Sequence, residues 1–454
     1  MKYRKEKDSL GYVEVPKYAY WGAQTQRSLM NFPKNVEIMP IDQIHALVYI
    51  KKAAAISNNK LGKLDDERKD TIVKACDCVF DGDMDDQFPL TVWQTGSGTQ
   101  SNMNVNEVLS HIGNELAGED ILHPNDHINM SQSSNDTFPT AMHISTLLNL
   151  RGHLYPALEK MHKELKKLEK NNKGIVVTGR THLQDATPLS LSQEISAWTT
   201  MLERDGKYIK ETAEVLKKLA IGGTAVGTGL NAPAGFDKTI CQVLSDLTGL
   251  DLEPDDNKFF QLSSKAGMVK MHGALKVLAT DLYKMASDIR FLACGPRCGI
   301  GELIIPANEP GSSIMPGKVN PTQVESLTMI CLQVLGNDTT ISMANTQGQL
   351  QLNVYMPLII YNMTQSIILL SKGMEGFTEK LLKGMKANKK RIEANLESTL
   401  MTVTALSPII GYDKASEIAK HAYANDMTLK EACLDLGYLS EKEFDEHSDP
   451  TKMI

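Results

Sequence analysis

Two serine hydroxyls and one lysine ammonium lie within seven residues of one another, in the segment GSSIMPGKVNP at positions 311–321. Glycine permits backbone conformations that other residues avoid, and proline fixes its own φ angle. The composition therefore predicts a shaped, mobile loop that brings hydroxyls and backbone N–H groups toward an anion. An ordinary Gly/Pro turn would have the same composition, because these residues are common in turns.

Three further polar segments interrupt the apolar pattern of the chain, and we expect each to precede a helix. The N-terminus of a helix has free N–H groups and suits a carboxylate. Plain capping turns use the same Ser, Thr, Asn and Asp residues, so this alternative stays open. The segments are QTGSGTQSNMN at 94–104, SQSSND at 131–136, which follows HPND at 123–126, and GRTHLQDA at 179–186.

His182 is the most informative of the 11 histidines. It lies in a polar turn that we expect at the entry of a helix, where an imidazole can transfer protons. A single histidine is more often structural, but the neighbouring Thr181 and Gln184 favour a site. Together the four segments supply hydroxyls, amides, a lysine and a histidine, and Glu325 follows the last of them. This inventory suits a small dicarboxylate and proton removal beside a carboxylate, assisted by a fixed cation.

The composition excludes several other classes of function. A net charge of −7 and a pI of about 5.9 show no basic footprint for nucleic acid. No apolar run approaches the ~18 residues that a membrane span needs. The N-terminus lacks the apolar core of a signal peptide. The seven cysteines form no zinc pattern with the histidines, so we expect no metal and reduced thiols in a cytoplasmic protein.

Helical periodicity dominates the central half of the chain. Apolar residues recur at alternating steps of three and four from Met268 to Leu292 and from Leu147 to Leu168, as in a coiled-coil seam. Pro156 predicts a kink in the second of these helices. Helices of this length predict a long five-helix bundle. The remaining long helices are expected over 188–219, 321–343 and 352–374.

The flanks of this bundle differ from it in pattern. We expect an N-terminal, mostly helical domain at 1–135, the bundle domain at 136–392 and a small helical domain at 393–454. Several bundle helices are apolar on more than one face, which predicts an obligate oligomer. Short strands are expected at 13–15 and 175–177. Shorter helices are expected over 41–60, 65–79, 101–116, 416–424 and 428–436.

These motifs resemble the fumarase/aspartase superfamily over essentially the full chain, and class II fumarases, the iron-independent fumarate hydratases, most closely. The segment 311–321 is similar to the signature loop of the superfamily. The resemblance implies a mainly α, three-domain fold with a central five-helix bundle, and a homotetramer with a twenty-helix core whose active sites each draw on three chains. The other similar segments are WQTGSGTQSNMN at 93–104, HPND at 123–126, SQSSND at 131–136, GRTHLQDATPL at 179–189 and GGTAVGTGLN at 222–231.

The resemblance also implies an activity and roles for single residues. The activity is the reversible anti addition of water to fumarate, giving (S)-malate, in the tricarboxylic acid cycle and without a cofactor. Ser312 resembles the base that removes the C3 proton of malate, and His182, paired with Glu325, the residue that handles water at C2. The positions implied to bind the dicarboxylate are Ser97, Gly98, Thr99, Ser133, Ser134, Asn135, Thr181, Ser313, Lys318, Val319 and Asn320. A second, peripheral anion site is implied at His123, Pro124, Asn125 and Asp126.

Two departures from the class II pattern keep an alternative open. Met130 stands where many class II fumarases carry a lysine, and QGQLQLN at 347–353 resembles the aspartase version of that segment. Aspartate ammonia-lyase is therefore the alternative activity. His182 argues against it, since aspartases usually have glutamine there, as does Gly317, where they usually have alanine. A non-catalytic structural oligomer is a third hypothesis, against which the retained catalytic candidates argue.

Overall fold

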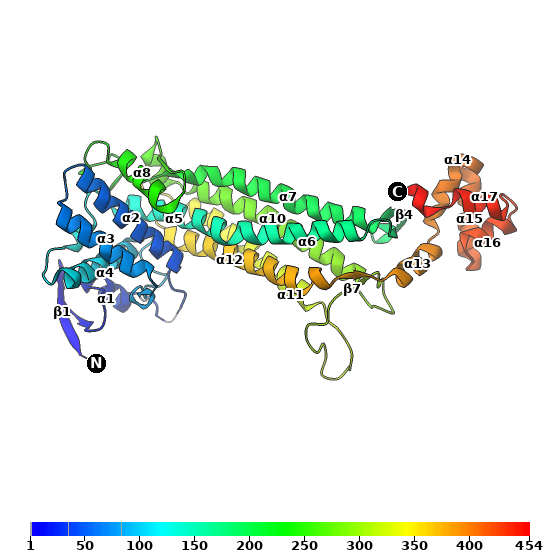
Figure 1. The fold of residues 1–454 in the computed structure, drawn as a ribbon, viewed down its shortest axis with the longest axis horizontal. Coiled ribbons are helices and arrows are strands. Elements are labelled where there is room, and N and C mark those ends of the chain that lie inside the picture. Colours follow the sequence, from blue (N-terminus) through cyan, green and yellow to red (C-terminus); the bar gives the residue numbers. More distant parts are fainter. Residues whose placement is uncertain (1, 35, 83) are drawn as a thin grey trace. The chain divides into compact units, whose positions relative to one another are not determined.

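The computed structural model describes residues 2–34, 36–82 and 84–454 as a predominantly helical protein (Figure 1). It divides into two compact units. The first unit comprises Met1–Pro156, Lys207–Val277 and Leu332–Leu370, and the second comprises Ala157–Gly206, Leu278–Cys331 and Ser371–Ile454. The predicted division at 1–135, 136–392 and 393–454 follows other boundaries and stays a prediction. Within the described residues, no helix is both long and apolar enough to cross a membrane.

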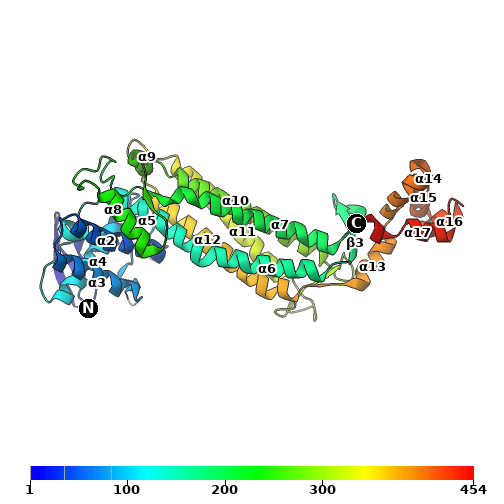
Figure 2. The ribbon, with the colours of Figure 1, turned by 45° about the horizontal axis from the view of Figure 1, so that its top comes forward.

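Five long helices run through the central part of the chain, as the apolar periodicity predicts (Figures 1 and 2). The positions of the Met268–Leu292 seam are buried from Met268 through Ile289, which confirms that this stripe packs inward. One helix begins later than predicted, because Pro357 occupies its first turn and proline favours that position. The helices are α6 (Tyr155–Asn171), α7 (Leu191–Ala213), α10 (Ala266–Leu292), α11 (Thr322–Asn345) and α12 (Met356–Lys380).

Two of the predicted helices need correction at their ends. The helix expected over 188–219 is shorter, because residues 188–190 complete a strand and 214–219 form a 3₁₀ turn and a short strand. The expected kink is a π-helical segment, η3 (Leu150–Leu154), between α5 (Ser134–Asn149) and α6. It lies directly before Pro156, whose ring nitrogen cannot donate a helical hydrogen bond.

The shorter helices form one group in each unit. In the first unit, α2 packs against α3 and α3 against α4, so these three helices lie side by side (Figure 2). In the second unit, the C-terminal helices enclose a small apolar core that includes Leu406, Ile418 and Phe444. The first group is α1 (Ala23–Asn31), α2 (Ile41–Lys60), α3 (Asp66–Phe80), α4 (Thr99–Ala117), α8 (Phe236–Thr248) and α9 (Lys258–Ser263). The second group is α13 (Lys389–Ser398), α14 (Ser407–Ile410), α15 (Tyr412–Asn425), α16 (Leu429–Asp435) and α17 (Glu441–His447).

The strands form small two-stranded sheets. The strands expected near 13–15 and 175–177 are present as β2 (Gly11–Pro16) and β3 (Val176–Thr181). Each pairs antiparallel with a strand that the sequence did not predict, β1 (Tyr3–Asp8) and β4 (Gln184–Ser190) respectively. Two-residue strands complete the set: β5 (Lys218–Leu219) with β6 (Glu253–Pro254), and β7 (Leu303–Ile304) with β8 (Lys386–Ala387).

Candidate active site

A row of three hydroxyl groups joins the starts of two helices in the first unit. Ser97 Oγ lies 2.8 Å from Thr99 Oγ1, and Thr99 Oγ1 lies 2.8 Å from Ser134 Oγ. Thr99 is the first residue of α4 and Ser134 is the first residue of α5. The structure therefore brings together the predicted segments 94–104 and 131–136. Hydroxyls at two helix N-termini form a suitable site for a carboxylate.

Gly98 permits the close approach of these two helix starts. Its φ angle is +72°, in the left-handed region that favours glycine, and no side chain caps α4 at this position. A Cβ atom on Gly98 would lie 2.1 Å from the ring of Phe138, which is fully buried in α5. Glycine at this position thus allows the backbone before Thr99 to pass against α5.

The segment 131–136 is a capping turn, which was one of the two interpretations of its sequence. Ser133 Oγ accepts a hydrogen bond from Asn135 N, and Ser133 N donates to Asp136 Oδ1 at 2.9 Å, forming a capping box. The Ser133 hydroxyl can still donate its own proton to a ligand. The turn is therefore both a cap and a candidate contact for an anion.

The carboxylate of Asp136 fixes this turn against a distant part of the first unit. Its Oδ2 accepts hydrogen bonds from Gly222 N at 3.0 Å and Thr224 N at 2.9 Å. Next to it, Asn135 Nδ2 donates to Ala225 O at 2.8 Å. Burial raises the pKa of Asp136 to about 6, and the backbone N–H donors partly oppose this rise. The segment 222–231 thereby contacts the candidate site.

The predicted peripheral anion residues form one turn around a short π-helix, η2 (Pro124–Ile128). His123 Nδ1 accepts the N–H groups of Asn125 and Asp126 and lies 3.2 Å from Asp126 Oδ2. His127 Nδ1 accepts the N–H group of His123, and burial lowers the pKa of His127. The four predicted residues are thus neighbours on the surface, with the His123 ring serving as the cap.

His182 lies at the tip of the β3–β4 hairpin in the second unit and not at the entry of a helix. Thr181 pairs with Gln184, so His182 and Leu183 form a two-residue turn. Their φ angles are +58° and +60°, as a type I′ turn requires. Thr181 and His182 are exposed. Backbone outliers of this kind in residues other than glycine occur often at functional sites.

A bidentate ion pair holds the end of β3 next to this turn. Both terminal nitrogens of Arg180 donate to the carboxylate of Glu302, at 2.9 and 2.6 Å. Asn395 Nδ2 donates to the same carboxylate at 2.8 Å. Because Glu302 is almost fully buried, this bidentate pair gives the strand before His182 a fixed position.

The loop at 311–321 is closed by contacts within itself. Ser312 Oγ accepts the N–H groups of Ile314 at 3.3 Å and Met315 at 3.1 Å. Asn320 Nδ2 donates to Gly311 O, which joins the two ends of the loop. These hydrogen bonds close the loop on itself, and the loop exposes Ser313, Lys318 and Val319.

Glu325 lies in the first turn of α11, and its carboxylate faces α10. Its Oε1 is 3.9 Å from Arg290 Nη2. Within the described residues, the ion-pair partner of Glu325 is Arg290, and no hydrogen bond joins it to His182. His182, Ser312 and Glu325 all belong to the second unit, whereas the hydroxyl row belongs to the first. The candidate residues are thus divided between the two units.

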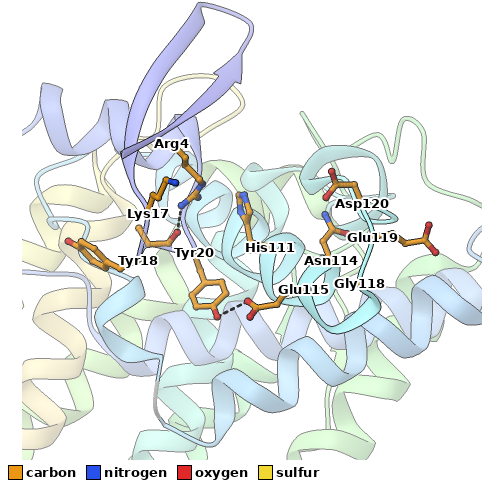
Figure 3. Close-up of a pocket in the computed structure, with 11 residues that line it drawn as sticks. Arg4, Lys17, Tyr18, Tyr20, His111, Asn114, Glu115, Gly118, Glu119 and Asp120 are labelled. Atoms are coloured by element: carbon orange, nitrogen blue, oxygen red, sulfur yellow. Dashed lines mark hydrogen bonds between the residues drawn. The ribbon is translucent and has the colours of Figure 1, made fainter. Parts of the chain in front are cut away.

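A separate cavity of about 740 Å³ lies in the first unit between the end of α4 and the β1–β2 hairpin (Figure 3). Tyr20 Oη donates to Glu115 Oε2 at 2.8 Å across its floor. The Arg4 guanidinium donates to the carbonyls of Pro16, Ala19 and Trp21. The residues lining this cavity include none of the predicted site residues, so it is distinct from the hydroxyl row.

Comparison with known proteins places the whole chain in one family. Residues 11–336 match the lyase family, and residues 403–454 match the fumarase C C-terminus. The class II fumarase of Schistosoma mansoni superposes with a TM-score of 0.97 at 42% identity, over 100% of this chain and 99% of that one. A fumarate lyase:delta crystallin structure from Brucella melitensis, bound to cobalt, gives 0.95 at 39% identity, with the same coverage. The mainly α fold with five long helices is therefore that of a fumarase-type lyase.

Full-length relatives narrow the assignment. The class II fumarate hydratases of Bacillus cereus and Bacillus subtilis are each 52% identical over 100% of this chain and 99% of theirs. That of Halalkalibacterium halodurans is 54% identical with the same coverage. The chain belongs to the class II fumarate hydratase family. The aspartase alternative is not favoured.

Replacing Asp136 tests the anchor of the candidate site. We expect Asp136→Asn to lower the free energy of unfolding by about 2–4 kcal/mol, because an amide cannot accept all three buried N–H groups. Denaturant unfolding monitored by circular dichroism measures this change. Asp256→Asn, whose side chain is 99% exposed, is the matched control and leaves the midpoint unchanged.

The raised pKa of Asp136 also predicts how the free energy of unfolding changes with pH. Because the pKa of Asp136 is raised from 3.8 to about 6 on folding, its ionisation favours the unfolded state. Its contribution to stability therefore falls as the pH rises from about 4 to about 6. The free energy of unfolding of Asp136→Asn should not show this decrease between pH 4 and pH 6. An unchanged midpoint and slope in the variant would contradict the role of Asp136 as the anchor.

Proposed function

We propose that this protein catalyses the reversible anti addition of water to fumarate, giving (S)-malate. The observation that carries the proposal is identity of 52–54%, over the full chain, to relatives named as class II fumarate hydratases. The presence of His182 in the hairpin turn, where aspartases usually have glutamine, supports hydration and not the addition of ammonia.

One residue of the aspartase-like segment at 347–353, Asn353, has a packing role in the structure. It forms part of the connection between α11 and α12, and Asn353 anchors its end. Asn353 N donates to Leu262 O at 3.1 Å, and Asn353 Nδ2 donates to Ala344 O at 3.0 Å. The backbone that follows packs against the candidate site, since Met356 N donates to Gly96 O at 3.0 Å. The asparagine thus has a packing role that requires no ammonia chemistry.

Ser312 is the proposed base that removes the C3 proton of malate. A serine hydroxyl is a weak base unless its alkoxide is stabilised. Two backbone N–H groups, of Ile314 and Met315, already point at Ser312 Oγ and would stabilise negative charge on it. The exposed ammonium of Lys318 in the same loop supplies further positive charge for the developing aci-carboxylate, where one such donor contributes ~3–4 kcal/mol.

The remaining roles follow the same assignment. His182, with Glu325, is proposed to handle the water at C2. The residues proposed to bind the two carboxylates are Ser97, Gly98, Thr99, Ser133, Ser134, Asn135, Thr181, Ser313, Lys318, Val319 and Asn320. The turn from His123 to Asp126 is the proposed second anion site. We also propose a cytoplasmic location, supported by seven cysteines that are all free thiols.

Subunit assembly is proposed to complete the active site as a homotetramer with a twenty-helix core. Helix α11 buries one apolar face, including Val324, Leu327 and Val334. It also exposes a second apolar stripe of Met329, Leu332 and Met343, which are 65%, 55% and 61% exposed. A helix that is apolar on two faces is expected to be buried on both.

The activity can be measured directly. We expect the purified protein to interconvert fumarate and L-malate with a metal chelator present, because its candidate residues need no metal. The ultraviolet absorbance of fumarate reports both directions. Ammonia release from aspartate without hydration of fumarate would contradict the proposal.

The role of Ser312 predicts a specific kinetic change. We expect Ser312→Ala to lower kcat by at least about a hundredfold, since general-base catalysis contributes ~10²–10⁴. The KM for malate should change far less, because the hydroxyl acts mainly in the transition state. Ser398→Ala, on the exposed end of α13, is the control and retains full turnover. A kcat near the wild-type value in Ser312→Ala would reject Ser312 as the base.

The oligomeric state tests the subunit proposal. Light scattering after size exclusion should give a mass of about 200 kDa, four times the chain mass of 50.1 kDa. Replacing Met329 and Leu332 together with lysine should shift the protein to smaller species with reduced activity, since both changes put charge on the exposed stripe of α11. A stable, fully active monomer would disprove the shared site.

A further inference from the structure

Lys51 is a fully buried lysine in α2 whose ammonium contacts only neutral groups. Its Nζ donates to Asn102 Oδ1 at 2.7 Å, to Asn129 Oδ1 at 3.0 Å and to Gln132 Oε1 at 2.9 Å. These three amide oxygens use all three N–H donors of the ammonium. Within the described residues, no carboxylate lies within 4.0 Å of it. The side chain has no exposed surface.

A buried charge of this kind is unfavourable for stability. Removing an ammonium from water costs several kcal/mol, which neutral hydrogen bonds offset only in part. Burial accordingly lowers the pKa of Lys51 to about 7, against the more distant charge of Asp136. The position of the charge therefore suggests a role other than stability.

The acceptors of Lys51 belong to the two segments that carry the hydroxyl row. Asn102 lies in the first turn of α4, just after Thr99, and its Oδ1 also accepts the hydroxyl of Thr137 at 3.1 Å. Gln132 directly precedes Ser133, the cap of α5. Asn129 Nδ2 donates to Gln132 O at 3.3 Å, which closes the cluster. The ammonium thus lies behind the row and links its two halves.

The groups that face Lys51 leave its positive charge uncompensated at close range. Asp136, on α5, directs its carboxylate to three backbone N–H groups, of Ser133, Gly222 and Thr224. Cys76, on α3, is a fully buried thiol, and burial raises its pKa, so it stays neutral. A dianion at the hydroxyl row would be the missing negative partner.

We propose that Lys51 is a positioning residue, whose buried charge attracts the dicarboxylate to the hydroxyl row and whose three hydrogen bonds hold the two halves of that row together. This inference rests on the proposed function, because it takes the dicarboxylate as the ligand. It adds a cation behind the substrate site to the groups implied by the family resemblance.

The test separates charge from hydrogen bonding. Lys51→Gln removes the charge but keeps an amide that can donate two hydrogen bonds. We expect the KM for fumarate and the dissociation constant for succinate, a dicarboxylate that does not react, both to rise at least about tenfold. The kcat should stay within about threefold, since the charge binds substrate and transition state alike.

The adjacent lysine provides the control. Lys52 lies on another side of α2, and its ammonium pairs with Asp77 at 2.5 Å. Lys52→Gln should leave both KM and succinate binding unchanged. Loss of kcat with an unchanged KM in Lys51→Gln, or values equal to those of Lys52→Gln, would overturn the role of Lys51.

The pH dependence supplies a readout that a merely structural lysine would not change. Lys51 loses its charge as the pH rises through about 7, so the wild-type dissociation constant for succinate should increase between pH 7 and pH 9. That increase should be absent in Lys51→Gln. If this variant does not fold, calorimetry of the wild type at pH 8 in two buffers tests the same point, since binding should take up a proton. Absence of proton uptake would overturn the inference.

These measurements also separate the inference from the proposed function. Wild-type turnover of fumarate with unaltered binding in Lys51→Gln would reject only the role of Lys51. A wild-type protein that neither hydrates fumarate nor binds succinate would reject both.

Discussion

The buried carboxylate of Asp136 is the interaction on which the candidate site depends. Its two oxygens accept N–H groups from Ser133, Gly222 and Thr224, so one side chain fixes the start of α5 and a turn some ninety residues later in the chain. Because Ser134 follows Ser133 directly and contacts Thr99, the start of α4 is held by the same anchor. A carboxylate suits this task, since it is an acceptor at both oxygens and binds N–H groups more strongly than a neutral amide does.

Asp136 and Lys51 carry opposite charges, and both are buried, but they make no direct contact. Asp136 is satisfied by backbone N–H groups and Lys51 by side-chain amides, and burial shifts the pKa values of both toward neutrality, to about 6 and about 7. A direct ion pair with Asp136 would neutralise the charge of Lys51, which could then not attract an anionic ligand. Neutral partners keep the geometry fixed, since every polar atom of such a network must be satisfied, and they leave the positive charge of Lys51 without a close counter-charge. The polar core thus specifies the site more than it stabilises the fold.

The apolar periodicity of the sequence is sufficient to predict the long helices but not the arrangement of the candidate site. Helix α2 has the predicted bounds, Ile41–Lys60, and α10 differs from its seam by a few residues, because a long buried face repeats many times. The sequence does not predict the hairpin that carries His182, because a two-residue hairpin turn usually contains Gly, Asn or Asp. Pro188 also resembles the first residue of a helix. Burial of Lys51 could not be predicted either, since the adjacent Lys51 and Lys52 have the same local sequence and only tertiary packing distinguishes them.

The error at His182 has a physical meaning of its own. Local rules fail where a residue adopts a conformation that its type disfavours, and both His182 and Leu183 have left-handed φ angles. For residues other than glycine this conformation costs roughly 1–2 kcal/mol each, so the surrounding structure must enforce it. The bidentate Arg180–Glu302 pair fixes the end of β3, two residues before His182. The turn thereby presents an exposed imidazole on a short, fixed support, which a proton-transfer group requires and an ordinary surface histidine does not.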